Sequence, residues 1–190
     1  MTANTTVLVS TSVTPASLYA RALGPLFHRL APVLTRLHGT GERRLHGTLK
    51  VRVGARPHVR LMMSIARMPR SSEAVESEVA LGAHRNGELW WRRVGDLEMV
   101  SVQLPGGDKE IIERIGPLAI HLFTEVRKGN LWQRSRYTTL FGIPLPATLG
   151  MQIVACERAI DAKSFFFDVR LRTPLLGCLL QYRGTLRFEN

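Results

Sequence analysis

From about Arg44 to the C-terminus, apolar and polar residues alternate in runs that turn residues interrupt every ten or so positions. This pattern is typical of one strongly curved antiparallel sheet. It is clearest between residues 110 and 130, where one strand face would carry Leu118, Ile120, Leu122, Thr124 and Val126, and the other Ala119, His121, Phe123, Glu125 and Arg127. A long sheet must bury an apolar face, either under a helix or by closure into a barrel. Closure around a cavity would make a small-molecule site.

Turn dipeptides divide this region into about nine strands in meander order. Asn86-Gly87 and Gly106-Gly107 favour tight hairpins because these residues accept positive φ at low cost. Two long strands flank the turn at residues 128–130. The core face of that hairpin is predicted to be Leu118, Ile120, Leu122, Leu131 and Tyr137.

Two segments carry helical periodicity instead. Residues 18–37 form one apolar stripe that Gly24-Pro25 and Pro32 interrupt, so we expect two or three short helical pieces covering one end or the open mouth of the sheet. Residues 57–68 return to helical spacing, with Pro57 near the helix N-terminus, where the missing N–H is tolerated. Apolar residues surround most of this second helix, which predicts burial on two sides.

The predicted fold class is therefore α+β and mostly antiparallel β. We expect a strongly curved meander sheet or β-barrel of about nine strands, with N-terminal helices and one inserted helix covering it. A chain of 190 residues fits one domain with a sizeable core. Residues 1–14 are interpreted as a flexible tail, and residues 15–190 as a single β-barrel-like domain.

The formal net charge of +11 raises nucleic acid or an anionic membrane as a partner. Arg supplies 22 of the 26 basic residues, and these arginines are dispersed along the strands. A GC-rich genome would produce that bias without selection for phosphate contacts. Scattered solvated charge is therefore favoured over a specific nucleic-acid site.

The two cysteines and the N-terminal sequence are the features that indicate a cellular compartment. Cys156 and Cys178 each lie in a strand-like run, which fits a reducing compartment and two packed thiols, although a bridge between them stays open. The N-terminus lacks the pattern of a secretion signal, and no run approaches the ~20 apolar residues of a membrane span. We expect a cytoplasmic protein.

Four sequence segments together resemble a family of bacterial β-rich domains of unknown function. They are LYARALGPLFHRLAPVLTRLHG at 18–39, ERIGPLAIHLFTEV at 113–126, LFGIPLPATLG at 140–150 and FFFDVRLRTPLLGCLLQYRGTLRF at 165–188. Members of that family are often found C-terminal to a nucleotide-binding, reductase-like domain, which this sequence lacks. The resemblance implies a compact β-rich domain and assigns no catalytic residues.

The chain carries no catalytic motif of high specificity. Its six histidines lack the spacing of metal ligands, and neither a GxGxxG fingerprint nor a P-loop is present. No serine sits in a nucleophile elbow. We therefore expect neither a metal nor a cofactor.

Polar residues within apolar strands are the candidate catalytic groups: Tyr137, Tyr182, His121 and Asp168. His121 and Glu125 share a strand face roughly 13 Å apart and could not pair directly. Asp168 is interpreted first as part of a solvated outer stripe with Arg170 and Arg172. In that case Phe165, Phe167, Val169 and Leu171 would face the interior.

Large and polar residues near the same strands are the candidate ligand-binding groups. Only one of the adjacent Trp90 and Trp91 can face an interior, because neighbouring strand residues point to opposite faces. Plain core packing is the alternative for every apolar member. The candidate set is Met62, Met63, Trp90, Trp91, Phe123, Glu125, Glu157 and Phe165.

Three functions fit this inventory. The leading hypothesis is a barrel that binds a hydrophobic, polyketide- or lipid-like metabolite and acts as a cofactor-free cyclase or isomerase by template catalysis. The first alternative is a non-catalytic ligand-binding or accessory module for a separate oxidoreductase. The second is a basic protein that binds anionic lipid or nucleic acid. A homodimer is left open.

Overall fold

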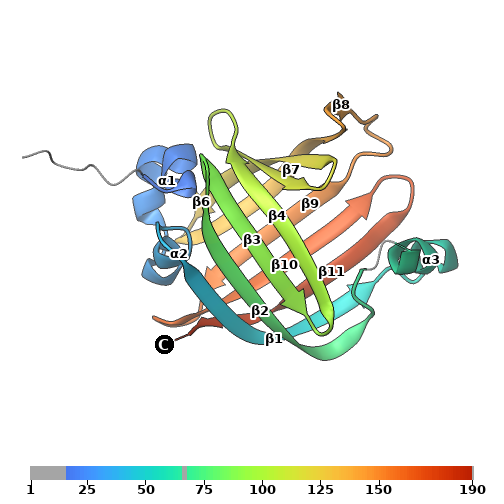
Figure 1. Cartoon of the computed structure of the whole chain (residues 1–190), viewed down its shortest axis with the longest axis horizontal. Helices are drawn as coiled ribbons and strands as arrows, with labels where there is room; N and C mark the ends of the chain where they lie inside the picture. Colours follow the sequence, from blue (N-terminus) through green and yellow to red (C-terminus); the bar gives the residue numbers. More distant parts are fainter. Residues whose placement is uncertain (1–15, 66–67, 190) are drawn as a thin grey trace, which may run out of the picture.

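The protein is a closed antiparallel β-barrel of ten strands with one further strand outside it (Figure 1). The computed structural model describes residues 16–65 and 68–189. The predicted fold class is thus confirmed, although eleven strands stand where about nine were expected. β8 has only two residues, too few for alternation to reveal it. The strands are β1 (Arg43–Val53), β2 (Ser72–His84), β3 (Gly87–Val94), β4 (Leu97–Pro105), β5 (Glu110–Ile115), β6 (Leu118–Arg127), β7 (Asn130–Leu140), β8 (Ile143–Pro144), β9 (Gln152–Ala159), β10 (Ser164–Thr173) and β11 (Gly177–Phe188).

Pairing between the first and last strands closes the meander. β1 and β11 are antiparallel neighbours from Leu45 opposite Phe188 to Val53 opposite Leu180. One glycine on each strand lies where the two backbones approach closely: Gly47 is opposite Leu186, and Gly184 is opposite Leu49. A Cβ atom on Gly47 would lie 1.9 Å from the carbonyl oxygen of Thr185, and one on Gly184 would lie 2.2 Å from that of Thr48. The backbones at the seam therefore approach more closely than any other residue type allows.

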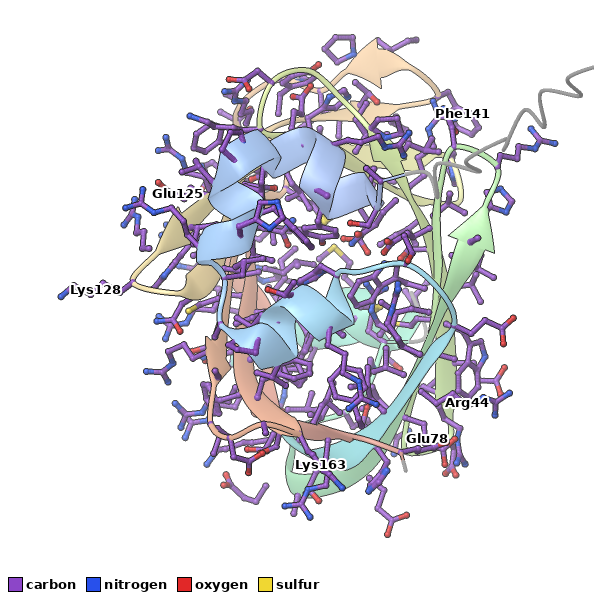
Figure 2. All side chains as sticks on the ribbon, turned by 90° about the vertical axis from the view of Figure 1, so that its left-hand side faces the viewer. Arg44, Glu78, Glu125, Lys128, Phe141 and Lys163 are labelled. Carbon is purple, nitrogen blue, oxygen red and sulfur yellow. The ribbon has the colours of Figure 1, made fainter. Side chains whose placement is uncertain are left out.

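Three short helical pieces cover one end of the barrel (Figures 1 and 2). α1 (Leu18–Leu23), the 3₁₀ helix η1 (Gly24–Arg29) and α2 (Pro32–Leu37) follow one another, and the breaks fall at the expected glycine and prolines. The apolar stripe faces the barrel, and Leu34 and Leu37 are fully buried. The expected number and place of these helices are confirmed. We call the three pieces the helical plug.

The third helix, α3 (Pro57–Ile65), lies at the opposite end of the barrel (Figure 1). Only Val59 and Met63 are buried, whereas Leu61 and Ile65 are 63% and 75% exposed. The prediction of burial on two sides is wrong, because α3 packs one face on the end of β1 and leaves the other uncovered. The predicted continuation through residues 66–67, like the predicted tail at 1–14, lies outside the described residues.

A β-bulge corrects the predicted core face of the longest hairpin. His121 of β6 pairs with Tyr137, but the next residue, Leu122, pairs with Ser135, so β7 holds one extra residue. Such an insertion reverses the inside–outside alternation of the residues that follow. Tyr137 is consequently 46% exposed rather than in the core, whereas Leu122 is buried as predicted, along with Ile120 and Leu131.

The two cysteines are both free. Cys156 is buried, but Cys178 is exposed beside the turn before β11, so the expectation of two packed thiols holds for Cys156 alone. No helix among the described residues is long and apolar enough to cross a bilayer.

The plug should be part of the folding core. Leu34→Ala removes a fully buried side chain between α2 and the barrel and should lower the free energy of unfolding by about 2 to 5 kcal/mol. Leu175→Ala is the matched control, because Leu175 is 62% exposed in the β10–β11 turn. Urea unfolding of both variants measures the difference. Equal losses would mean that the plug does not pack as described.

Candidate functional site

The barrel encloses a cavity of about 590 Å³ with a mainly apolar wall. Inward-facing residues of nearly every barrel strand contribute to it, because strand alternation places every second side chain inside. The helical plug forms one end of the cavity and α3 contributes at the other. Among the apolar lining residues are Leu37, Leu49, Met63, Val79, Trp90, Met99, Ile120, Leu122, Ile153, Phe165, Phe167 and Leu180.

A buried ion pair interrupts this apolar wall. Arg92 on β3 donates a hydrogen bond from Nη2 to Glu113 Oε1 on β5 at 3.0 Å, and one from Nη1 to Ser101 Oγ on β4 at 2.7 Å. Ser101 Oγ also donates to the same carboxylate oxygen at 2.7 Å. The three residues share the inward parity of neighbouring strands, and all three line the cavity. Burial alone would lower the pKa of the Arg92 guanidinium, but the Glu113 carboxylate holds that pKa above its usual range.

Tyr182 on β11 presents a hydroxyl to the same cavity. No hydrogen bond from the described part of the chain engages this hydroxyl, although the Arg92 and Glu113 charges act on it. Burial raises the pKa of Tyr182; the nearby Arg92 charge opposes that rise and the Glu113 charge adds to it. The group is therefore neutral at physiological pH and keeps a proton that it can donate to a bound oxygen atom.

A hydrogen-bonded group of polar side chains connects the helical plug to the barrel wall. The Tyr19 hydroxyl of α1 donates to Gln103 Oε1 at 3.0 Å and accepts from Gln133 Nε2 at 3.4 Å. Gln133 also donates to Thr124 Oγ1 at 3.2 Å. Burial, reinforced by the charges of nearby carboxylates, raises the pKa of Tyr19 well above its usual value. Tyr19, Gln103 and Gln133 line the plugged end of the cavity.

His38, which follows α2 directly, makes a further polar contact with the barrel. Its Nε2 lies 2.6 Å from Glu157 Oε2 on β9, and its ring contacts that of Tyr19 at a tilt of 34° with the centroids 3.8 Å apart. His38 is fully buried, and its Nδ1 has no hydrogen-bond partner within the described residues. Glu157 lines the cavity, whereas His38 lies behind it.

Close by, Glu88 on β3 and Arg43 on β1 form a buried pair with 3.5 Å between Glu88 Oε1 and Arg43 Nη2. Burial raises the pKa of Glu88, and the nearby positive charge of Arg43 opposes that rise. Neither residue lines the cavity. The pair therefore belongs to the packing beneath the plug.

The wall of the barrel is incomplete between β4 and β5. Their pairing ends at Val102 opposite Arg114, so Leu97–Ser101 has no partner strand on that side in the described structure. Cavity-lining Val100 and Ile115 flank this gap and are 50% and 44% exposed. The cavity thus reaches solvent near the end of the barrel that α3 and β8 occupy.

The structure brings five of the sequence-predicted site residues to the cavity wall. Tyr182, Trp90 and Phe165 face the interior from three strands. Glu157 does so from β9, and Met63 from α3. Of the two adjacent tryptophans it is therefore Trp90 that lies inside, while Trp91 lies outside and donates to Glu98 at 3.4 Å.

The remaining predicted site residues lie away from the cavity wall. His121 stacks on Tyr137 on the outer surface with the ring centroids 4.0 Å apart. Phe123 packs under two arginines, and Asp168 forms an ion pair with Arg170 at 3.0 Å, as the solvated-stripe interpretation predicts. Two further residues are placed outside the cavity: Glu125, which pairs with Arg127, and the half-buried Met62 of α3.

Apart from Tyr182 and Glu157, sequence reasoning missed the polar residues that line the cavity. Arg92, Ser101 and Glu113 each occupy a strand position in phase with a buried neighbour, such as Trp90 two residues before Arg92. The sequence therefore indicated their inward orientation, because each is separated by an even number of positions from a buried residue of its own strand. The role of Tyr19 could not be predicted, because it belongs to a helix and its neighbours in space are distant in sequence.

Among residues 16–65 and 68–189, no cluster of three or more histidine, cysteine, aspartate or glutamate side chains could hold a metal ion.

The buried tyrosines should make the free energy of unfolding fall as the pH becomes alkaline. Because the folded pKa values of Tyr19 and Tyr182 are raised, the unfolded chain releases these protons first. Their contribution to stability is complete below the usual tyrosine pKa of about 10 and is lost as pH rises through the folded values.

Urea unfolding at a series of alkaline pH values should therefore give a falling free energy of unfolding, with a smaller fall in Tyr182→Phe. Tyrosinate absorbance of the folded protein provides the independent readout, because Tyr182→Phe should remove a late-ionising component. An unchanged pH dependence in this variant would place the Tyr182 hydroxyl in water.

One solved structure, a protein of unknown function from the DUF3598 family of Nostoc punctiforme, is similar at 10% identity with a TM-score of 0.48. The match covers 94% of this chain and 53% of that one, so the chain spans about half of its length.

Two further solved structures match more weakly. A dehydratase domain from the CurJ module of curacin polyketide synthase shares 8% identity with a TM-score of 0.22, over 83% of this chain and 78% of that one. An inactive mutant of the CurJ dehydratase in complex with Compound 21 shares 9% identity with the same score, over 89% and 83%.

No curated protein matches the sequence. A family model does match, over residues 30–186, and it is described as a domain of unknown function, DUF4166. The matched region runs from the helical plug to the closing strand of the barrel. The chain belongs to the DUF4166 family.

Proposed function

We propose that this barrel binds a hydrophobic small molecule, such as a polyketide- or lipid-like metabolite, in its interior. The cavity volume of about 590 Å³ falls within the range of roughly 300 to 1,000 Å³ that is typical of ligand pockets. Its apolar wall would take up a hydrocarbon skeleton, and the gap beside Val100 and Ile115 provides a path to it.

The observation that carries this proposal is the Tyr182 hydroxyl, which no described residue engages, beside the buried pair of Arg92 and Glu113. A polar atom in an apolar cavity is costly unless a partner satisfies it. A ligand oxygen would supply that partner. The preferred ligand is therefore an apolar molecule with a carbonyl or hydroxyl group that reaches the Tyr182 side of the cavity.

The same arrangement suits cofactor-free cyclisation or isomerisation. In a ring closure, the enol carbon of a β-dicarbonyl unit bonds to a carbonyl carbon of the same chain whose oxygen accepts a hydrogen bond from Tyr182. The C=O π bond opens as this C–C bond forms, the oxygen takes up the enol proton, and the nearby Arg92 charge stabilises the negative character that develops on it. The apolar wall would hold a flexible chain in a folded shape, which removes part of the entropy cost of ring closure. Glu113 holds Arg92 in place through Nη2 and is a positioning residue in this scheme.

Binding can be tested by filling the cavity. Ala155 on β9 lines the cavity, whereas its neighbour Val154 lies on the outer face and is 45% exposed. Ala155→Trp should abolish the fluorescence enhancement of the neutral dye N-phenylnaphthylamine, and Val154→Trp should leave it intact. Overpacking costs about 1 to 3 kcal/mol, so thermal melting must show that both variants are folded. Equal dye binding by the two variants would place the dye outside the barrel and contradict the proposal.

Catalysis requires a separate measurement. Linear polyketide analogues with β-dicarbonyl groups serve as substrates, and chromatography with mass spectrometry follows their conversion. Tyr182→Phe should slow conversion by about a hundredfold or more while dye affinity changes little, because the hydrogen bond strengthens in the transition state. Tyr137→Phe, on the outer surface, is the matched control. Dye binding without conversion by the unaltered protein would leave the carrier or accessory function.

A further inference from the structure

Exposed apolar side chains are concentrated at one end of the barrel. Of the large hydrophobic residues described, seven are more than half exposed, and only Ile160 of these lies at the plugged end. The other six lie on α3, around β8 and in the β10–β11 turn, which occupy the opposite end in Figure 1. We call these six the apolar rim: Leu61, Ile65, Phe141, Ile143, Leu149 and Leu175.

The apolar rim adjoins the gap in the barrel wall. The Phe141 N–H donates to the Pro117 carbonyl oxygen at 2.9 Å, which ties the β7–β8 turn to the β5–β6 turn. Ile115, at the end of β5, flanks the gap and is itself 44% exposed. Phe141 is 79% exposed at the tip of its turn, and Figure 2 shows it at the periphery of the molecule. Exposed apolar side chains so placed mark an interaction surface.

The charge of this end is positive. Its described loops and helix carry the exposed arginines Arg56, Arg60 and Arg70 and one acidic residue, Asp96. Among the described residues none of these three arginines forms an ion pair. Arginines left unpaired beside exposed apolar side chains are complementary to a partner that presents both hydrocarbon and phosphate.

We propose that the apolar rim docks this end of the barrel on the surface of an anionic lipid bilayer. Phe141, Ile143 and the exposed face of α3 would enter the interfacial region, while Arg56 and Arg60 bind lipid phosphates. A second copy of the chain fits less well, because a symmetric contact would bring the arginines of two molecules together. Duplex nucleic acid would satisfy the arginines and leave the apolar rim in water.

This docking does not depend on whether the cavity holds a ligand, because it rests on surface residues alone. Its failure is therefore distinguishable from failure of the proposed binding function. If both hold, the gap beside Val100 faces the bilayer, and an apolar molecule could pass between lipid and cavity without crossing bulk water.

Vesicle sedimentation with the full chain tests the proposal. The protein should sediment with vesicles of phosphatidylcholine containing about 30% phosphatidylglycerol, and far less with phosphatidylcholine alone. The double variant Phe141→Ser with Ile143→Ser should weaken binding at least about tenfold. Its matched control is Leu89→Ser with Ile160→Ser, which removes exposed apolar residues near the plugged end and should bind like the unaltered protein.

A charge variant keeps the test independent of the apolar substitutions. Arg56→Gln with Arg60→Gln should weaken binding and reduce its salt dependence, whereas Arg158→Gln with Arg187→Gln, exposed near the plugged end, should not. Equal binding to neutral vesicles, or equal effects of test and control variants, would overturn the proposal. So would a dimer that the Phe141 variant dissociates, or tight binding to duplex DNA at physiological salt without vesicle binding.

Discussion

Every feature of this protein depends on the pairing of its first strand with its last. The meander supplies neighbours for the inner strands, but only the β1–β11 seam satisfies the two edges that would otherwise remain open. At that seam Gly47 and Gly184 lie on the inward face, where a Cβ atom would collide with backbone carbonyl oxygens. Closure thus requires glycine at two positions about 140 residues apart in sequence.

Closure also determines where polar side chains can go. In the closed barrel, every second residue of a strand faces the interior. Water is excluded from that interior only where apolar side chains line the wall. Arg92 can occupy this space because Ser101 and Glu113, from the next two strands, satisfy its guanidinium. The buried pair adds little net stability by itself, since desolvation of both charges offsets their attraction. Together with Tyr182 and the Tyr19 group, this pair gives a mainly apolar wall a few fixed polar positions.

Sequence reasoning identified the architecture because alternation and turn residues are local signals. The helical plug was likewise visible in the spacing of its leucines and in its prolines. The inward face of β7 after Ser135 could not be predicted, because a bulge is visible only in the pairing of two strands. The burial of α3 was overestimated for a related reason, since an apolar helix does not reveal how much neighbouring surface exists to cover it.

The candidate site divides in the same way. Trp90, Phe165, Glu157, Tyr182 and Met63 could be proposed from residue type and position, whereas the grouping of Arg92 with Ser101 and Glu113 depends on the register of three strands. Parity alone would have placed these residues inside but would not have paired them. Tyr19 and His38 are harder still, because they reach the barrel interior from helices that precede every strand.

The two ends of the barrel differ in how they are closed, so one end of the cavity is harder to open than the other. At the plugged end, Tyr19 and His38 hydrogen-bond into the wall, so opening it would leave buried polar groups unsatisfied. At the other end, α3 buries only Val59 and Met63, and the β4–β5 ladder stops short of it. Opening there disrupts few contacts. Any molecule that reaches Tyr182 and Arg92 should therefore enter from the end that carries the apolar rim, which makes the chemistry of that rim decisive for what the cavity can receive.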